Sequence, residues 1–414
     1  MASATIDHMV SLIVFIGALL IFIGLFSQSI QTANVYERHR ALSTKTSDLL
    51  DTMLLNPGVP ANWGQSNSDV TGFGVQDPEF TQYQISPFSL MRLEASNGNI
   101  LECDKSSPNI YYDDESLGSG STLLIPVDQA LNYSSALTIL GIKNTYGFQL
   151  TFTPDITVSI TENQASSPLS LTLSATGTGF PFAYATVNYC LIQAKLPQSQ
   201  AEYPAYTVQS GDVTTDQQGI ANISFPSITD PNQVYAFVAY AHLNGVLGVG
   251  YHTRTSSNDQ YVVPIVQNMA TQQIALAHNF DLNGTGPEGS SLKYNATFVI
   301  LKQDFTLSEL SFGAPGNLSL VGTVTSGRGN PSPNVFLPPT TTGILIVTYQ
   351  LSPTQGGIVM MPWGISSLAF PVTFGGNPQG QEWVTTDLRQ VTIGGVAYQV
   401  KLELWDTTGQ QVTT

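Results

Sequence analysis

The sequence predicts a mainly β protein: one long N-terminal transmembrane and stalk helix, then a small mixed α+β neck and two β-sandwich-like domains. An uninterrupted apolar run near the N-terminus predicts the membrane segment. A stretch without Gly or Pro behind it predicts the stalk. Alternation of apolar and polar residues from Tyr146 onward predicts the strands. The expected segments are 1–58 (helix), 59–150 (neck), 151–265 (Ig-like sandwich) and 266–414 (second sandwich).

The composition limits the functions that this chain can have. Its 414 residues include 13 Lys and Arg but 29 Asp and Glu, and only 10% are charged, against roughly 25% in an average soluble domain. This argues against nucleic acid as a partner, because such binding needs clustered cations. With 42% hydrophobic residues the chain can bury a core. A surface of hydroxyls and amides instead of ion pairs is commoner outside cells.

The apolar run from Met9 to Phe26 carries no charge, and none follows it before Glu37. At about 1.5 Å per residue, about eighteen to twenty-two residues cross a bilayer core of roughly 30 Å. A cleaved secretory signal is the alternative, but no basic segment precedes the run and no clear cleavage site follows it. We expect contact with membrane lipid or with neighbouring N-terminal helices. The expected contact residues are Met9, Ile13, Phe15, Gly17, Leu20, Phe22, Gly24 and Phe26.

The helix is expected to continue beyond the membrane. No Gly or Pro occurs from residue 31 to residue 55, and Val35, Leu42 and Leu49 recur at a spacing of seven. This spacing predicts a weakly amphipathic stalk. The tripeptide Asn56-Pro57-Gly58 then predicts its end, since it combines a residue that tolerates the left-handed conformation, a helix breaker and a flexible turn.

Charge and composition give opposite orientations for the chain. Arg38, Arg40 and Lys45 follow the apolar run, and the positive-inside rule alone would place the large C-terminal part in the cytoplasm. The charge-poor composition favours the cell exterior, and we expect that orientation. The chain also has Asn-x-Ser/Thr sequons, which are candidate glycosylation sites. They are Asn132, Asn222, Asn283, Asn295 and Asn317.

The neck is expected to contain two helices, Pro87 to Leu93 and Val127 to Leu140. The strands that follow show a period of two, and the Asn244-Gly245 and Gly394-Gly395 pairs predict hairpin turns. Asn222 falls in the outward phase of its strand. The expected strands centre on residues 156–160, 169–175, 221–225, 234–243, 246–252, 318–324, 344–349, 368–374, 391–393 and 396–404.

The N-terminal part of the chain resembles a known class of surface proteins. A short polar leader, an apolar run, a continuous helix and a β-rich head resemble archaeal type IV pilins and archaellum-related proteins. The segment from Leu54 to Gly64 followed by Gly72-Phe73-Gly74 is similar to the region after the helix in these proteins. The resemblance implies a surface protein anchored, or assembled into a filament, through its helix. The stretch from Thr215 to Ala221 resembles a turn of Ig-like surface repeats and implies an Ig-like β-sandwich.

No catalytic motif stands out. The sequence lacks the H-E-x-x-H and Cys-x-x-Cys spacings, a nucleophile elbow and the Gly-rich phosphate loops. His242 and His252 flank the Asn244-Gly245 turn and could face one another, as a structural pair or a metal site. The segment from Asp281 to Gly286 opens like an EF-hand loop, but Leu292 stands where a bidentate Glu is needed. A surface turn and a casual calcium site both remain open.

Three further features each allow two interpretations. The tryptophans pack in the core or form a sugar-stacking platform; they are Trp63, Trp363, Trp383 and Trp405. Cys103 and Cys190 are free or form one bridge. The acidic run from Asp113 to Glu115 is a solvated loop or a contact for a cation or partner.

The sequence therefore predicts a non-enzymatic, pilin-like structural protein of the cell surface, without a cofactor or a metal. It is expected to be a single-pass membrane protein with a large extracellular part, and a homo-oligomer or filament is its expected assembly. A stalked carbohydrate- or surface-binding adhesin is the alternative. A membrane-anchored extracellular hydrolase is the third hypothesis, because 29 acidic residues could include a catalytic pair of carboxylates.

Overall fold

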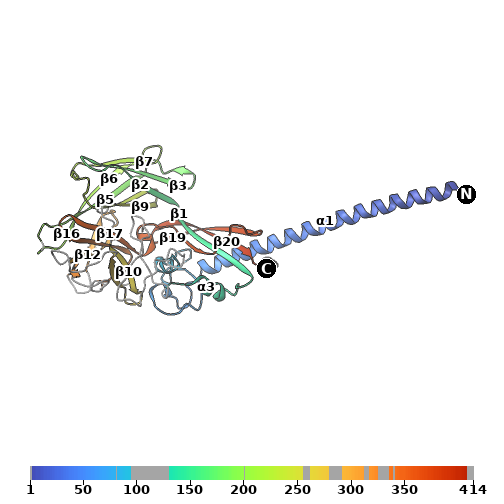
Figure 1. Ribbon diagram of the computed structural model, residues 1–414, viewed down its shortest axis with the longest axis horizontal. Coiled ribbons are helices and arrows are strands. Elements are labelled where there is room, and N and C mark those ends of the chain that lie inside the picture. Colours follow the sequence, from blue (N-terminus) through green and yellow to red (C-terminus); the bar gives the residue numbers. More distant parts are fainter. Residues whose placement is uncertain are drawn as a thin grey trace.

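A computed structural model describes most of the chain, and it contains one long helix that projects from a β-rich body (Figure 1). The prediction of a mainly β fold behind an N-terminal helix is confirmed. The described residues are 2–80, 82–94, 130–199, 201–254, 262–278, 291–311, 317–324, 335–338 and 341–407.

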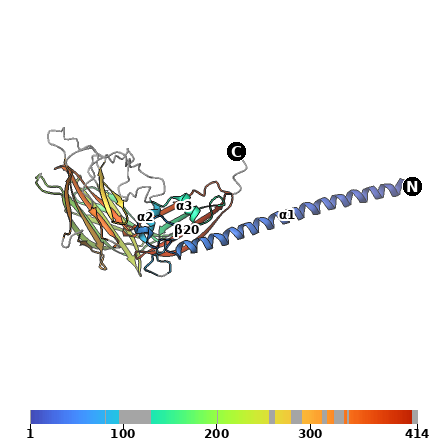
Figure 2. The ribbon, with the colours of Figure 1, turned by 90° about the horizontal axis from the view of Figure 1, so that it is seen from below.

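Helix α1 runs without interruption from Ala2–Leu54. Its 53 residues correspond to a length of about 80 Å. The predicted end is confirmed: Pro57 lacks a backbone N–H, and Gly58 adopts a φ of 84°, which L side chains rarely tolerate. Only the last turns of the helix lie against the body, and the rest extends away from it (Figures 1 and 2).

Three short helices lie in the described part of the neck. They are η1 (Trp63–Gln65), α2 (Pro87–Glu94) and α3 (Tyr133–Ile139). The prediction of α2 is confirmed, but α3 begins later than expected. Asn132 is its N-cap, with an extended backbone and a side-chain oxygen that accepts a hydrogen bond from Ser134 N at 2.7 Å, so residues 130–132 are outside the helix. Residues 127–129 lie outside the described part of the chain.

The sheet next to α1 combines strands from distant parts of the sequence. Its antiparallel order is β18-β1-β20-β19. The strands are β1 (Tyr146–Pro154), β18 (Val372–Gly375), β19 (Val384–Ile393) and β20 (Val396–Asp406). The predicted Gly394-Gly395 turn is confirmed, because Ile393 pairs with Val396. Strand β1 extends across residue 150, the expected end of the neck, and pairs with β18 and β20. This sheet therefore combines residues of the expected neck with strands of the expected second sandwich.

The middle of the chain forms a curled sheet of order β4-β3-β2-β9-β8-β5-β6, with β7 beside β3. The alternation predicted for β2, β3 and β7 is confirmed, and the turn at Asn244-Gly245 joins β8 to β9 as expected. The strands are β2 (Ile156–Gln164), β3 (Leu169–Gly177), β4 (Phe180–Pro181), β5 (Thr186–Lys195), β6 (Ala205–Thr214), β7 (Ile220–Phe225), β8 (Tyr235–Leu243) and β9 (Val246–Arg254).

Two further sheets lie in the described part of the body. One has the order β10-β11-β15, and the other has β13-β12-β16-β17 with β14 beside β12. Their strands are β10 (Val262–Asn268), β11 (Gln273–His278), β12 (Leu292–Leu301), β13 (Leu307–Leu310), β14 (Leu320–Val324), β15 (Val335–Phe336), β16 (Gly343–Ser352) and β17 (Gln355–Trp363), and η2 (Ile365–Ser367) follows.

Strand β8 joins the two hydrophobic cores because both of its faces are buried. Tyr235 and Phe237 pack in the core of the curled sheet. Val238 and Tyr240 point the other way, into the larger core, which also includes residues of β12, β16 and β20. The continuous apolar run of β8 follows from this double burial.

Candidate functional site: the apolar helix and its junction with the β body

The N-terminal half of α1 exposes apolar side chains on every side. The described part of the chain has one helix long and apolar enough to cross a membrane, with a mean hydropathy of 2.9 in its best window and none of that window buried. Ile13 and Leu20 are 66% and 63% exposed. Monomeric soluble proteins rarely expose apolar surface continuously over this length, and this segment is long and apolar enough to cross a membrane.

The predicted membrane residues all lie on this exposed segment. Met9, Phe15, Phe22 and Phe26 are among its exposed side chains, and the Phe22 and Phe26 rings stack at 6.2 Å between centroids. A Cβ added to Gly17 or Gly24 would meet nothing within 4 Å. Both glycines therefore leave room for close approach of a lipid chain or a second helix.

The helix meets the body through one apolar stripe. Leu42, Leu49 and Leu50 are buried, as are Met53 and Leu54. The spacing of seven correctly predicted burial of Leu42 and Leu49. Val35 is 46% exposed and does not continue the stripe, because it precedes the part of α1 that packs against the strands.

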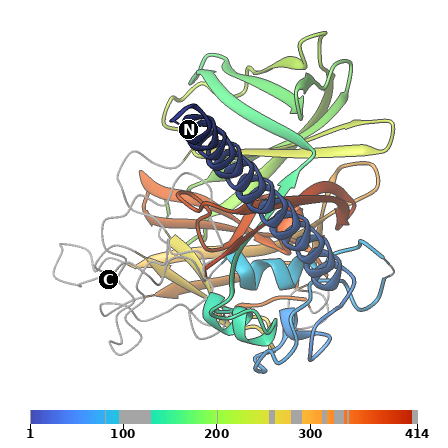
Figure 3. The ribbon, with the colours of Figure 1, turned by 90° about the vertical axis from the view of Figure 1, so that its right-hand side faces the viewer.

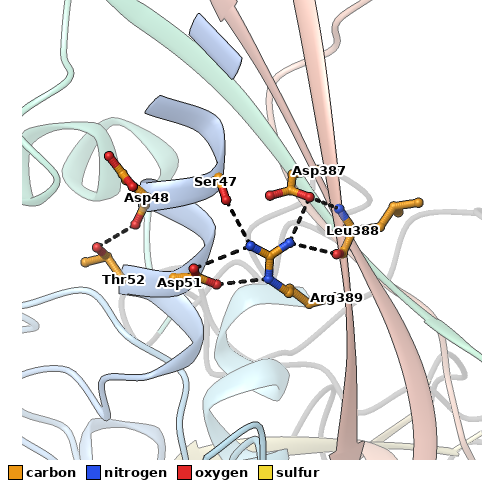
Figure 4. Close-up of polar contacts among 7 residues, drawn as sticks. All are labelled: Ser47, Asp48, Asp51, Thr52, Asp387, Leu388 and Arg389. Carbon is orange, nitrogen blue, oxygen red and sulfur yellow. Dashed lines mark hydrogen bonds and ion pairs between the residues drawn. The ribbon is translucent and has the colours of Figure 1, made fainter. Parts of the chain in front are cut away.

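Polar contacts flank the stripe on the side of β19. The buried hydroxyls of Thr46 and Thr385 lie 2.5 Å apart. Figure 4 shows the second contact, in which the Arg389 guanidinium reaches from β19 to the helix. It donates to Asp51 Oδ1 at 3.0 Å and to Ser47 Oγ at 2.9 Å. It also donates to Asp387 Oδ1 on its own strand at 2.8 Å.

The pKa values at this junction reflect the pairing of charges. The hydrogen bond to Asp51, followed by the contacts with Asp387, raises the pKa of Arg389. Burial alone would raise the pKa of Asp387. Hydrogen bonds from the Leu388 backbone, Ser47 and Arg389 outweigh it, and the pKa of this carboxyl lies below its ordinary value. The junction therefore holds its charged form near neutral pH.

A third contact holds the helix closer to its exposed apolar segment. Arg38 lies 2.5 Å from the Asp406 carboxylate at the end of β20. Its guanidinium also lies over the Trp383 ring, 5.5 Å from the centroid. Arg38 and Asp51 are thirteen positions apart, so the contacts extend over about 20 Å of helix. Three polar contacts and the apolar stripe hold the helix along this length. Contacts at several points along the helix fix its direction relative to the body.

The sequence did not indicate the residues of this junction. Thr385, Asp387 and Arg389 occupy a strand whose alternation of residue types is ordinary. Their partners on α1 are more than 330 positions away. One acidic residue, Asp387, two positions before Arg389 was the local signal, and such a pair is too common to identify a contact.

A second cluster of charges lies in the curled sheet. Glu162 Oε2 accepts hydrogen bonds from Tyr235 at 2.6 Å and from Arg254 at 2.8 Å. Burial would raise the pKa of Glu162, but these hydrogen bonds outweigh it and lower the pKa below its ordinary value. Arg254 also donates to the carbonyl oxygens of Pro231 and Ala165. These donors and acceptors pair with one another, so the cluster connects strands β2, β8 and β9 with the loops at Ala165 and Pro231.

The two histidines beside the hairpin do not face one another. His242 pairs with Leu247 across the turn, while His252 pairs with Phe237. His242 stacks on Phe305 at 4.3 Å and contacts Asn188 at 2.8 Å. His252 lies 3.9 Å from Glu162. The expectation of a facing pair is wrong, because a two-residue turn pairs residues at equal distances from it.

No group of three potential metal ligands occurs among the described residues. The calcium-like segment from Asp281 to Gly286 and the acidic run from Asp113 to Glu115 lie outside them. The tryptophans are mostly packed in the interior: Trp63 and Trp363 are fully buried, and Trp405 nearly so. These three cannot form a sugar-stacking platform, and packing is the correct interpretation for them.

The remaining sequence-predicted residues are dispersed over the body. Asn132 and Asn222 are exposed, with side-chain oxygens held by Ser134 N and Thr172 Oγ1. Asn317 is also exposed, Asn295 is half-buried on β12, and Asn283 lies outside the described residues. Cys190 is a buried free thiol, and burial raises its pKa. Cys103 lies outside the described residues.

No protein-family model matches the chain, and no curated protein matches it. A red sea bream transglutaminase aligns over 50% of this chain and 31% of its own length, with 10% identity and a TM-score of 0.16. The CBD12 structure from CALX1.2 aligns over 45% of this chain and 74% of its own, with 9% identity and a TM-score of 0.15.

The C2A and C2B domains of extended-synaptotagmin 2, solved with calcium bound, align over 63% of this chain and 96% of their own length. Their identity is 7% and the TM-score 0.09. This chain spans about a third of the length of the transglutaminase it matches. At these TM-scores the similarities carry no argument about function, and no pilin or archaellum family is shown. The chain has a β-rich body behind one N-terminal helix that is long and apolar enough to cross a membrane.

Proposed function

We propose that this chain is a non-enzymatic, pilin-like structural protein of the cell surface. Its N-terminal helix holds it in a membrane or among neighbouring helices of an assembly, and its β body lies outside the cell. The role is mechanical: the helix connects the membrane, or the helices of an assembly, to the β body and holds the body at a distance from them.

One observation carries this proposal. The exposed apolar segment and the clamped stripe are parts of the same unbroken helix, α1 (Ala2–Leu54). Between Phe26 and Arg38 the helix covers about 18 Å without a buried residue. A flexible linker would let the body rotate freely. A continuous helix held by Thr385 and Arg389 fixes how the body stands relative to the anchor, which suits a structural subunit.

The distribution of charge supports the outward orientation. Ten of the thirteen basic residues and 25 of the 29 acidic residues follow residue 55. An acidic, charge-poor body is typical of an exposed surface. Of the three basic residues that favour the opposite orientation, Arg38 is paired with Asp406. The positive charge of Arg38 therefore has a structural role, on whichever side of the membrane the body lies.

Surface labelling tests the orientation. Gln217 is exposed in a turn of the curled sheet, and the variant Gln217→Cys should react with a membrane-impermeant maleimide in intact cells. The unsubstituted chain, whose Cys190 is buried, is the control for background. Labelling that requires permeabilised cells would place the body inside and overturn the proposed orientation.

Electron microscopy tests the assembly. Full-length chains extracted in detergent should remain single particles while detergent is present. After its removal, filaments would support assembly through α1, and detergent-dependent single particles would support a monomeric anchor. A chain that is monodisperse and monomeric without detergent or lipid would contradict both forms of the proposal, since the apolar segment would then need no cover.

A further inference from the structure

A small polar hollow lies beside β19, beyond the point where helix α1 ends and a loop lies next to the strand instead. Helix α1 covers β19 next to Thr385 and Arg389 and ends at Leu54. Beyond that point the segment around Gln84 pairs with Thr392 as a parallel bridge. The hollow between this segment and the end of β19 has a volume of about 310 Å³, near the lower end of the range for small-molecule sites.

The two walls of this hollow are tied together by the backbone. Thr392 N donates to the Tyr83 carbonyl at 2.9 Å, and Ile85 N donates to the Thr392 carbonyl at 2.9 Å. Tyr83 has a φ of 61°, a left-handed conformation that is uncommon for a bulky residue. The hydrogen bonds hold it in this conformation and direct the chain along the strand. The hollow is therefore formed before any ligand arrives.

The described residues of the lining are uncharged and rich in amides. They include Gln82, Gln84 and Gln390, with Tyr83 and Thr392 beside them. Gln390 donates from Nε2 to Asp155 Oδ2 at 2.5 Å, and among the described contacts its carbonyl oxygen accepts no hydrogen bond. The side chains of Gln82 and Gln84 make no hydrogen bond within the described part of the chain. Three amides are thus available at one place, each with an acceptor and at least one donor.

We propose that this hollow binds a neutral saccharide unit. A sugar hydroxyl donates and accepts hydrogen bonds at once, and a primary amide offers the complementary pair. Tyr83, whose side chain packs partly against the core, and Thr392 also line the hollow. An anionic ligand would meet no cation in the lining, and an apolar ligand would leave the amides unsatisfied. This binding site goes beyond the structural role proposed above and does not depend on it.

Saturation-transfer NMR on the full-length chain tests the proposal. The protein is held in lauryldimethylamine oxide micelles, because detergents with sugar head groups would compete. The probes are the methyl glycosides of glucose, galactose, mannose and N-acetylglucosamine, with methyl glucuronide as an anionic comparison. At least one neutral glycoside should bind with a dissociation constant on the order of 1 to 10 mM, as expected for so small a ligand, and the glucuronide should bind more weakly.

Two variants locate the binding. Gln84→Ala and Gln390→Ala should each weaken it about tenfold, since each removes a hydrogen-bonding group. Gln217→Ala, which changes an exposed glutamine far along the chain, should bind as the unsubstituted chain does. Thermal midpoints equal to that of the parent show that the variants are folded. The proposal is overturned if no neutral glycoside receives saturation, or if both pocket variants bind like Gln217→Ala.

Discussion

Arg389 on β19 and Asp51 on α1 are 338 positions apart in the chain, yet the guanidinium donates to the carboxylate at 3.0 Å. The same guanidinium also reaches Ser47 one turn earlier. The last turns of the helix are therefore attached to a hairpin near the C-terminus. Because β20 of that hairpin pairs with β1, the helix is attached to the sheet β18-β1-β20-β19. Figure 3 views the molecule from the side from which the helix projects.

Removal of the Arg389 side-chain charge should loosen this attachment. In Arg389→Met the carboxylates of Asp51 and Asp387 lose their shared partner. Hydrogen bonds to charged groups are worth about 1.5–3 kcal/mol when buried, and partial exposure reduces this, so we expect a loss of about 1–2 kcal/mol. Urea unfolding of the detergent-solubilised chain measures it. Arg40→Met, on an exposed part of the same helix, should change stability by less than about 0.5 kcal/mol; equal losses would contradict the model of the junction.

The apolar stripe should contribute more than the ion pair. Leu50 is fully buried, whereas Leu20 is 63% exposed on the same helix. Leu50→Ala should cost about 2–5 kcal/mol, from lost burial and the cavity that it leaves. Leu20→Ala should leave the thermal unfolding of the body unchanged. If the two substitutions lower the midpoint equally, the helix does not pack on the body as described.

The parts of the fold that sequence reasoning predicted are local. The apolar run, the stop at Pro57 and the turns at Asn244 and Gly394 are each encoded within a few residues. The pairing of β1 with β20 was not predictable, because a period of two shows that a strand is half-buried but does not identify its neighbour. The short strand β18 was also expected to be longer, since its preceding residues Leu368 and Ala369 are apolar but belong to the turn after η2.

In the candidate sites too, local features were predictable from the sequence and long-range contacts were not. Exposure of the apolar half of α1 followed directly from hydropathy. The position of the hollow did not, because Gln84 and Gln390 are ordinary polar residues until the fold brings their segments together. The charge of Arg38 suggested only topology, and its contact with Asp406 became visible with the tertiary structure. Long-range register, and not residue type, determines these sites.

Acid should destabilise the body through Glu162. Its pKa is lowered in the folded state, so the unfolded chain binds more protons as the pH falls. The stability that the folded pairing contributes is present above the ordinary pKa of about 4.3 and is lost as the pH falls through the folded value. Thermal midpoints between pH 7 and pH 3 should therefore fall, and less steeply in Glu162→Gln. Glu382→Gln, at an exposed position, should keep the parental slope. An unchanged slope in Glu162→Gln would show that this carboxylate is not linked to folding.

The turn after the helix should tolerate no side chain at Gly74. Its carbonyl accepts a hydrogen bond from Trp63 Nε1 at 2.7 Å, and a Cβ at this position would collide with the Asn56 carbonyl oxygen. Since that obstacle is backbone at the end of α1, relief requires the helix end to move. Gly74→Ala should therefore cost about 1–3 kcal/mol, as overpacking does, and change the fluorescence of Trp63. Gly24→Ala adds the same methyl group where nothing lies within 4 Å and should leave the unfolding of the body unaltered. A stable Gly74→Ala variant with parental fluorescence would mean that the helix end is not held against this turn.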